Sequence, residues 1–346
     1  MRTLSQSTVV ITGASAGVGR AVALRFARAG TNLALIARDA EALDAVRQEV
    51  ERLGATAMVV PLDVADANAV FGAADEIAAA RGGIDIWIND AMVTVFSPVW
   101  RMTAEEFRRV TEVTYLGFVH GTMAALRHMR PHNRGTIVQI GSALAYRGIP
   151  LQSAYCGAKY AIRGFTDSLR TELIHAKSAV KITIVELPAV NTPQFDWART
   201  HMAKAPRPVA PVVQPETIAD VVFRAALDPK REYWLGWSTL KAILGGMMLP
   251  TFLDRYLARN VYGGQQTDVP VSAERRDNLI TPVHDLHRTR GSFSQEAANA
   301  VVAVPGPVAR LMPLIASAVA GLTIGILLSV TPRRAGRMTR GKIRGA

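Results

Sequence analysis

The stretch Thr12-Gly13-Ala14-Ser15-Ala16-Gly17-Val18-Gly19-Arg20 decides the fold, because it joins the apolar run Thr8–Thr12 to a helix-like segment. Glycines allow a tight turn and let the backbone approach a pyrophosphate. The helix that follows offers free N–H donors and the positive end of its dipole. An ordinary glycine-rich βα turn is the alternative, but a position between a first strand and a first helix favours a nucleotide site.

Apolar runs alternate with amphipathic segments over the first two-thirds of the chain. The runs are rich in Val, Ile and Leu, which is typical of strands buried on both faces. They are Thr8–Thr12, Asn32–Ala37, Ala57–Leu62, Ile84–Ile88, Gly135–Ile140 and Lys181–Leu187. This order predicts an α/β fold, a doubly wound parallel sheet of Rossmann type with about seven strands, helices on both faces and a C-terminal helical extension.

The end of the second strand indicates which cofactor the turn would bind. A site for NAD usually places an acid there for the ribose 2′-hydroxyl. This chain has Ala37 and then Arg38, and a guanidinium suits a 2′-phosphate. The sequence therefore favours NADP(H). Asp39 can pair with Arg38 or cap the next helix, and the cap is the favoured interpretation.

Over roughly residues 7–228 the chain resembles the short-chain dehydrogenase/reductase family. The TGxxxGxG turn is followed in order by an acid–apolar pair, an Asn-Asp-Ala-Met run in place of Asn-Asn-Ala-Gly, a serine, a YxxxK pattern and a Pro-rich loop. These elements are Thr12–Gly19, Asp63-Val64, Asn89–Met92, Ser142, Tyr155 with Lys159, and Pro188–Pro193. Thr114 stands where the family often has an asparagine.

The resemblance implies a role for each matching residue. Catalysis is expected from Ser142, Tyr155 and Lys159. Cofactor binding is expected from Gly13, Ser15, Gly17, Val18, Gly19, Arg38, Asp63, Val64, Asn89, Ala91, Tyr155, Lys159, Pro188, Val190 and Thr192.

The chemistry of the three catalytic candidates fits an alcohol–ketone reaction. Tyr155 and Lys159 are four residues apart, so a helix places them one turn apart on one face. A nearby ammonium and the nicotinamide's positive charge favour the phenolate and lower the pKa of the tyrosine, which is ordinarily near 10. Ser142 would hydrogen-bond the substrate oxygen.

The chain divides into five predicted regions. Residues 1–230 form the NADP-binding catalytic domain, and 231–262 form an amphipathic helical region that packs on this domain, covers a lipophilic substrate or faces a membrane. Residues 263–310 are a polar linker or a loosely wrapped arm. The uncharged stretch 311–332 predicts a transmembrane helix, with a bundle helix or a re-entrant or interfacial helix as the alternatives, and 333–346 is a basic tail.

Charge and cysteine content exclude several classes of protein. The formal net charge is +12, but half of this excess lies in the basic tail, so no nucleic-acid partner is expected. The single Cys156 excludes an internal disulfide, and the histidines form no metal set. The N-terminus does not resemble a secretory signal, which predicts a cytoplasmic catalytic domain that is membrane-associated through its C-terminal segment.

Two functional hypotheses follow. The first is an NADP(H)-dependent oxidoreductase that interconverts a hydroxyl and a carbonyl on a lipophilic small molecule, with Tyr155 as general acid and base. The second is a non-catalytic NADP-binding protein that senses redox state or acts as a scaffold at a membrane. Thr114 and the altered Asn89–Met92 run favour the second, and the intact Ser142, Tyr155 and Lys159 favour the first. The family resemblance also implies a homo-oligomer.

Overall fold

The apolar runs form strands of one large sheet in the computed structural model, which describes residues 3–312. This sheet has eight strands in the order β15-β12-β7-β6-β4-β1-β2-β3. Their bounds are β1 Thr8–Thr12, β2 Asn32–Ala37, β3 Thr56–Pro61, β4 Ile86–Asn89, β6 Thr136–Ser142, β7 Lys181–Leu187, β12 Glu232–Leu235 and β15 Ala303–Pro305.

Seven of these strands are parallel, as the βαβ order predicts. The eighth, β15, pairs antiparallel with β12 at the edge of the sheet. It comes from the segment 263–310, which the sequence predicts to be a linker or a loose arm. The expected doubly wound sheet is confirmed, and the C-terminal part of the chain extends it.

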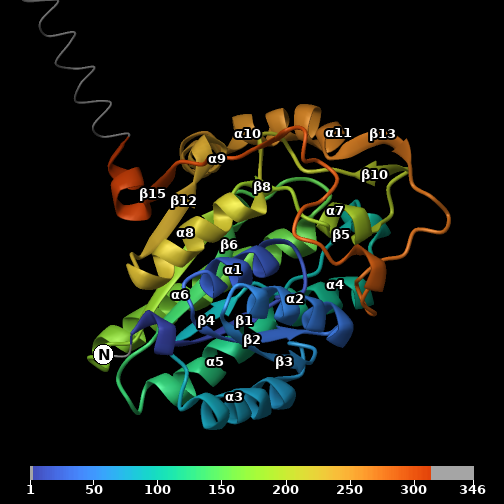
Figure 1. The fold of residues 1–346 in the computed structure, drawn as a ribbon. Helices are drawn as coiled ribbons and strands as arrows, with labels where there is room; N and C mark the ends of the chain where they lie inside the picture. Colours follow the sequence, from blue (N-terminus) through green and yellow to red (C-terminus); the bar gives the residue numbers. More distant parts are fainter. Residues whose placement is uncertain (1–2, 313–346) are drawn as a thin grey trace, which may run out of the picture. The chain divides into compact units, whose positions relative to one another are not determined.

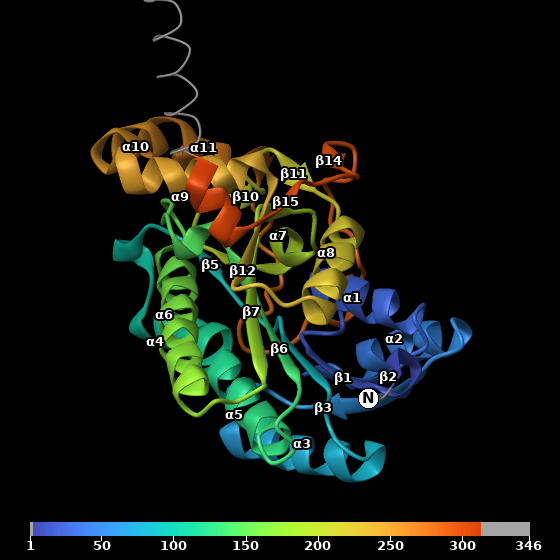
Figure 2. The ribbon, with the colours of Figure 1, turned by 90° about the vertical axis from the view of Figure 1, so that its left-hand side faces the viewer.

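Helices cover both faces of this sheet (Figures 1 and 2). The helices α1, α2 and α8 lie on one face, and α3, α4, α5 and α6 lie on the other. Their bounds are α1 Gly17–Ala27, α2 Ala40–Arg52, α3 Ala67–Arg81, α4 Ala104–Thr111, α5 Gly117–Met129, α6 Ser153–His175 and α8 Pro215–Leu227. A π-helical turn, η3 (Glu112–Leu116), joins α4 to α5.

The alternation of side chains along β2 shows how the two layers are filled. Leu33 and Leu35 pack into the core under α1 and α8, whereas Ala34 and Ile36 pack into the core under α3 and α5. All four are fully buried. Because successive strand residues point to opposite faces, one apolar run supplies both cores. Burying each of the larger side chains contributes about 1.5–3 kcal/mol.

Beyond β12 the chain builds a rim and an arm above the carboxyl ends of the strands. The rim consists of α9 (Gly236–Met248), α10 (Pro250–Tyr256), the π-turn η5 (Leu257–Val261) and α11 (Tyr262–Gly264). Three smaller sheets lie outside the main one. The first has three strands, β8 (Ala189–Val190), β11 (Val212–Val213) and β14 (Ala297–Ala298). The other two are pairs: β5 (Val95–Phe96) with β9 (Arg199–Thr200), and β10 (Lys204–Pro206) with β13 (Gln266–Pro270). A short helix, α7 (Gln194–Trp197), follows β8.

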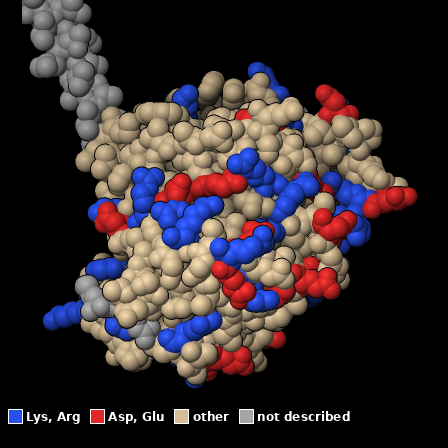
Figure 3. Space-filling view, viewed as in Figure 1, with Lys and Arg blue, Asp and Glu red and all other residues tan. Residues whose placement is uncertain are grey.

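The outer surface of the rim carries apolar side chains beside exposed charged ones such as Asp254 and Arg255. Met248, Leu249 and Phe252 are exposed, with exposed fractions of 68%, 58% and 61%. Figure 3 shows mostly uncharged surface in the upper part of the view, where α10 and α11 lie in Figure 1. Exposed apolar patches of this kind mark an interaction surface more often than isolated apolar residues do.

The structure bears on the predicted membrane segment only at its start. Among residues 3–312, no helix is long and apolar enough to cross a membrane. Residues 313–332 of the predicted segment and the basic tail lie outside the described residues. Residues up to Gly306 form one compact unit, and Pro307 begins another.

Candidate active site

The glycine turn is held against the end of β4. Gly13 and Gly17 have positive φ angles of 73° and 56°, which glycine adopts without strain. A Cβ on Gly13 would lie 2.9 Å from the Ala91 backbone, and a Cβ on Gly19 would lie 2.3 Å from the Gly13 carbonyl oxygen. The Thr12 hydroxyl accepts hydrogen bonds from the N–H groups of Asp90 (3.0 Å) and Ala91 (3.2 Å). Both the turn and the close approach therefore require glycine.

Asn89 serves the fold rather than the cavity. Its amide nitrogen donates to Gln139 Oε1 at 2.9 Å and to Thr122 Oγ1 at 3.1 Å, and its oxygen accepts from Trp87 Nε1 at 2.8 Å. The side chain is fully buried between β4, α5 and β6. The family resemblance implies that Asn89 binds cofactor, but its side chain does not line the cavity, and these contacts make it a residue that positions the end of β4.

Thr114 also holds the chain that follows β4. Its hydroxyl donates to the Val93 carbonyl at 2.8 Å and accepts from the Val93 N–H at 3.0 Å. Thr114 lies in η3 and is fully buried. The residue in place of the family's asparagine thus fixes the segment after β4 through two hydrogen bonds to the backbone.

Ser142 and Tyr155 meet at the carboxyl end of β6. Ser142 ends this strand, and its hydroxyl accepts from the Leu144 N–H at 3.1 Å. Tyr155 lies in the first turn of α6. Burial raises the pKa of the Tyr155 phenol, the nearby Cys156 thiol raises it further, and a hydrogen bond to the Ser142 side chain opposes the shift. The expected lowering of the Tyr155 pKa is therefore not found in this structure, because burial of the phenol is the largest influence and raises its pKa.

Lys159 lies one helical turn beyond Tyr155 and is almost fully buried. Its Nζ donates to the Ile140 carbonyl at 2.7 Å and lies 5.4 Å from the centre of the Tyr155 ring. Burial lowers the pKa of this ammonium, and the carboxylates of Asp90 and Glu186 oppose the shift. The YxxxK spacing therefore brings phenol and ammonium together, as predicted.

Two acids near Lys159 were not predicted as site residues. Asp90 faces the glycine turn, where it accepts from the Gly19 N–H, and burial raises its pKa. Glu186, on β7, is fully buried beside Gly141, and burial raises its pKa to about 8. The position of Asp90 directly after a buried strand is a signal that sequence reasoning could have used. For Glu186 the signal is an acid inside the apolar run Lys181–Leu187.

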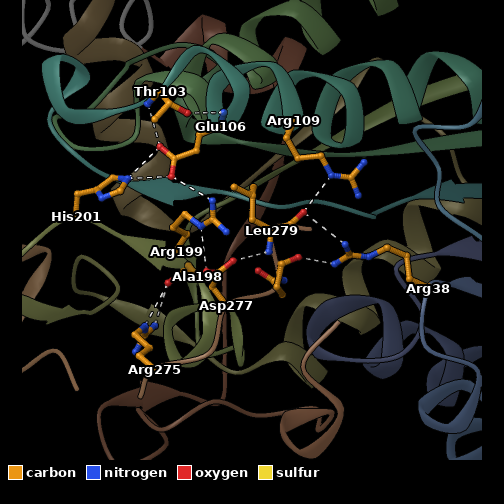
Figure 4. Close-up of polar contacts among 11 residues, drawn as sticks. Arg38, Thr103, Glu106, Arg109, Ala198, Arg199, His201, Arg275, Asp277 and Leu279 are labelled. Atoms are coloured by element: carbon orange, nitrogen blue, oxygen red, sulfur yellow. Dashed lines mark hydrogen bonds and ion pairs between the residues drawn. The ribbon is translucent and has the colours of Figure 1, made fainter. Parts of the chain in front are cut away.

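Arg38 reaches the cavity but is also bound by the arm. Its guanidinium donates to the carbonyls of Asn278 at 2.5 Å and Ile280 at 2.6 Å. Arg109, on α4, donates to the Leu279 carbonyl at 3.0 Å, so two guanidinium groups meet the same stretch of backbone (Figure 4). Burial lowers the pKa of Arg38, and the carboxylate of Asp63 opposes the shift.

Asp39 and Asp63, the two acids near Arg38, each have other hydrogen-bond and ion-pair partners. Asp39 caps α2 by accepting from the Ala42 N–H at 3.1 Å, which agrees with the interpretation as a cap. Its other oxygen lies 2.7 Å from His284 Nδ1 and 3.1 Å from His287 Nε2. Asp63 accepts from the Ala65 N–H and forms an ion pair with Arg109. Neither carboxylate pairs with Arg38.

A cavity of about 390 Å³ runs over the carboxyl ends of the strands and collects most of the predicted site residues. Asn89 and Gly19 are not on its wall. The predicted residues that line it are Gly13, Ser15, Gly17, Val18, Arg38, Asp63, Val64, Ala91, Ser142, Tyr155, Lys159, Pro188, Val190 and Thr192. No cluster of three or more potential metal ligands occurs among residues 3–312.

Comparison with known proteins identifies this arrangement. The family model for short chain dehydrogenases matches residues 7–203. The chain belongs to the short-chain dehydrogenase family. Members of this family are oxidoreductases that act on CH–OH groups, and their fold binds a nicotinamide cofactor. The eight-stranded sheet and its helices agree with this assignment.

Two individual relatives show how much of the chain the similarity covers. The uncharacterized oxidoreductase YxnA of Bacillus subtilis is 29% identical over 84% of this chain and 83% of its own length. A fatty acyl-CoA reductase of Acinetobacter baylyi is 32% identical over 64% of this chain and 74% of its own length.

Solved structures of other proteins match this chain at similar sequence identity. A metagenomic short-chain oxidoreductase in complex with NADP has a TM-score of 0.55 and 28% identity, over 64% of this chain and 91% of the other. An NAD⁺-bound xylitol dehydrogenase has a TM-score of 0.52 and 29% identity, over 55% of this chain and 72% of the other. Both nicotinamide cofactors therefore occur among proteins of this shape.

Proposed function

We propose that this short-chain dehydrogenase is an NADP(H)-dependent oxidoreductase that interconverts a hydroxyl and a carbonyl on a lipophilic small molecule, with Tyr155 as general acid and base. The observation that carries the proposal is the convergence of Ser142, Tyr155 and Lys159 in a cavity that begins at the glycine turn. Ser142 would orient the substrate oxygen, and Tyr155 would exchange a proton with it.

The residues around the glycine turn fit a bound dinucleotide. Gly17 starts α1, so the first turn of that helix, with the positive end of its dipole, lies at the cavity that Gly13, Ser15 and Val18 line. When bound, a reduced nicotinamide would supply the hydride. The buried ammonium of Lys159, 5.4 Å from the centre of the Tyr155 ring, would stabilise the phenolate that remains after Tyr155 gives up its proton.

Arg38 and Asp39 support NADP(H) over NAD(H). A ribose 2′-hydroxyl would need an acceptor, but the Asp39 carboxylate already meets the Ala42 N–H and two imidazoles. The Arg38 guanidinium lines the cavity and, at its buried position, gains from an added phosphate charge. The NADP-bound structural relative is in line with this choice.

Arg38→Asp tests the cofactor assignment. We expect the substitution to weaken the binding free energy of NADPH by about 1.5–3 kcal/mol, the contribution of a hydrogen bond to a charged group. The binding free energy of NADH should change much less. The binding of both cofactors would be measured by fluorescence titration. Arg108→Asp is the matched control, because Arg108 is exposed on α4, where it forms an ion pair with Glu112. An unchanged NADPH-to-NADH preference in Arg38→Asp would show that the phosphate lies elsewhere.

The proposal of a lipophilic substrate rests on the end of the cavity that lies under the rim. Ala242 of α9 and Leu257 and Val261 of η5 line the cavity there, together with Leu144 and Ile149. An apolar wall of this kind favours an aliphatic or alicyclic body over a polar one. The similarity to a fatty acyl-CoA reductase supports the same substrate class.

A screen of carbonyl compounds of increasing chain length would test the substrate class. Each methylene buried under the rim contributes about 0.8 kcal/mol, so kcat/KM should rise about fourfold per methylene until the cavity is filled. Equal kcat/KM values for short polar and long apolar carbonyls would overturn the lipophilic assignment. Tight NADPH binding without turnover of any carbonyl would instead indicate the non-catalytic sensor or scaffold.

We further propose that the protein associates with a membrane and forms a homo-oligomer. The exposed apolar residues Met248, Leu249 and Phe252 give the rim a surface suited to a lipid interface. Met123 of α5 and Tyr160 of α6 are also exposed, on the face of the sheet opposite α1. Light scattering on the purified chain would measure the oligomeric state.

A further inference from the structure

The segment between β13 and β15 crosses the nucleotide end of the cavity. We name residues 278–293 of this segment the strap. In Figure 1 the orange to red trace leaves β13, descends beside α4 and α7 and returns towards β15. The strap lies outside residues 7–203, the part of the chain that the family model matches. Its role therefore has to be inferred from its contacts.

The first anchor of the strap is its own backbone. The carbonyls of residues 278–280 accept from Arg38 and Arg109, as Figure 4 shows for the Leu279 oxygen. The Leu279 side chain is fully buried in the core under α3 and α5. The Asn278 N–H donates to the Trp197 carbonyl at 3.0 Å. One buried leucine side chain and several hydrogen bonds therefore fix residues 278–280 of the strap to the body of the domain.

The second anchor lies on the glycine turn itself. The Gly17 N–H donates to the Arg288 carbonyl at 3.0 Å, and Arg20 donates to the His287 carbonyl at 2.9 Å. The Asp39 carboxylate, at the end of β2, lies between the imidazoles of His284 and His287. The strap thus spans from the end of β2 to the first turn of α1.

The third anchor is the loop after β7. The Gly291 N–H donates to the Asn191 carbonyl at 3.1 Å, and the Phe293 N–H donates to Asn191 Oδ1 at 3.0 Å. A Cβ on Gly291 would lie 2.4 Å from the Thr192 carbonyl oxygen. Glycine is therefore required at 291 for the strap to lie this close to the loop that carries Val190 and Thr192.

The strap also supplies part of the cavity wall. Asn278, Pro282, Val283 and His287 line the same cavity as the glycine turn and Arg38. We propose that the strap is the second wall of the nucleotide site, so that a dinucleotide enters and leaves only when residues 278–293 lift from Arg38, Gly17 and Asn191. This inference rests on the proposed nucleotide site and adds a step of cofactor exchange to it.

The structure offers a matched pair of variants to test the strap. Gly291→Ala pushes it away from Thr192, whereas Gly264→Ala adds the same methyl group to the preceding α11, where no atom lies within 4 Å. Full-length protein loaded with NADPH would be mixed with excess NADP⁺, and the loss of NADPH fluorescence would give the dissociation rate. We expect Gly291→Ala to dissociate about tenfold faster than the wild type, because the variant loses at least one hydrogen bond of the closed strap. Gly264→Ala should match the wild type.

The outcomes separate the strap from the cofactor assignment. Equal dissociation rates for both variants and the wild type would overturn the strap proposal but leave the nucleotide site intact. A wild type that does not bind NADPH would overturn both. A second measurement covers the case in which Gly291→Ala does not fold. Saturating NADPH should slow amide hydrogen exchange of residues 278–293 in the wild type, and unchanged exchange there would contradict the strap.

Discussion

Glu186 is a buried acid whose titration should be visible in the stability of the whole protein. It is fully buried on β7, opposite Gly141 of β6, and a Cβ on Gly141 would lie 2.2 Å from its Oε2. Burial raises the pKa of its carboxyl from the ordinary 4.5 to about 8, and the nearby Glu232 adds to the shift. The Ser142 N–H, Lys159 and Arg163 oppose it.

The sign of the effect follows from this raised pKa. Between the unfolded and folded pKa values, the folded chain binds a proton at Glu186 that the unfolded chain has released. The stabilising contribution of the protonated group is therefore present below the unfolded pKa and is lost as the pH rises towards 8. One proton corresponds to about 1.4 kcal/mol per pH unit, so the loss amounts to about 2–4 kcal/mol over this range.

Glu186→Gln should remove this pH dependence, because an amide keeps the shape of the protonated acid and does not titrate. Urea unfolding at a series of pH values between about 5 and 8.5 would give the free energy of unfolding of both proteins. The stability of the variant relative to the wild type should rise by about 2–4 kcal/mol across the series. Glu172→Gln, at an exposed position on α6, is the control and should run parallel to the wild type. Parallel curves for Glu186→Gln would refute the reasoning.

Two further predictions concern packing and membrane association. Gly121→Ala should lower the free energy of unfolding by about 1–3 kcal/mol, because the added Cβ would lie 2.3 Å from Asn89 Oδ1. The control is Gly164→Ala, at a helical glycine where an added Cβ would meet no atom within 4 Å. This variant should be as stable as the wild type or more stable in the same urea titration. A chain ending at Met312 lacks the uncharged residues 313–332, so we expect it to sediment with membranes less than the full-length chain does. Equal sedimentation of the two chains would show that the residues after Met312 are not needed for membrane binding.

The sequence predicted the parts of the site that depend on local spacing. The glycine turn follows from its position between Thr12 and the first helix, and Tyr155 and Lys159 are brought together by one turn of α6. The parallel sheet follows from alternating runs, and Ser142 from its place at a strand end. In these cases neighbours in the chain are neighbours in space, or topology fixes where the strand ends meet.

The strap could not be predicted in the same way. Its contacts to Arg38 and Gly17 use backbone carbonyls, which carry no side-chain signature, and they join positions 240 or more residues apart. The polar composition of 263–310 indicates a linker because only a few of its residues, such as Leu279 and Val283, are buried. Asn89 shows a different limit: its residue type matches the family, but only the structure shows that its amide faces Gln139 and Thr122.

The central claim is that Tyr155 exchanges the proton that accompanies hydride transfer. It is tested most directly by single-turnover oxidation of NADPH with the best carbonyl substrate, in the wild type, Tyr155→Phe and Tyr160→Phe. Tyr160 lies on the same helix but is exposed, so it serves as the matched control. We predict that Tyr155→Phe reacts about 10²–10⁴-fold more slowly while its NADPH affinity is kept, and that Tyr160→Phe behaves as the wild type. Hydride transfer at the wild-type rate in Tyr155→Phe would contradict the account.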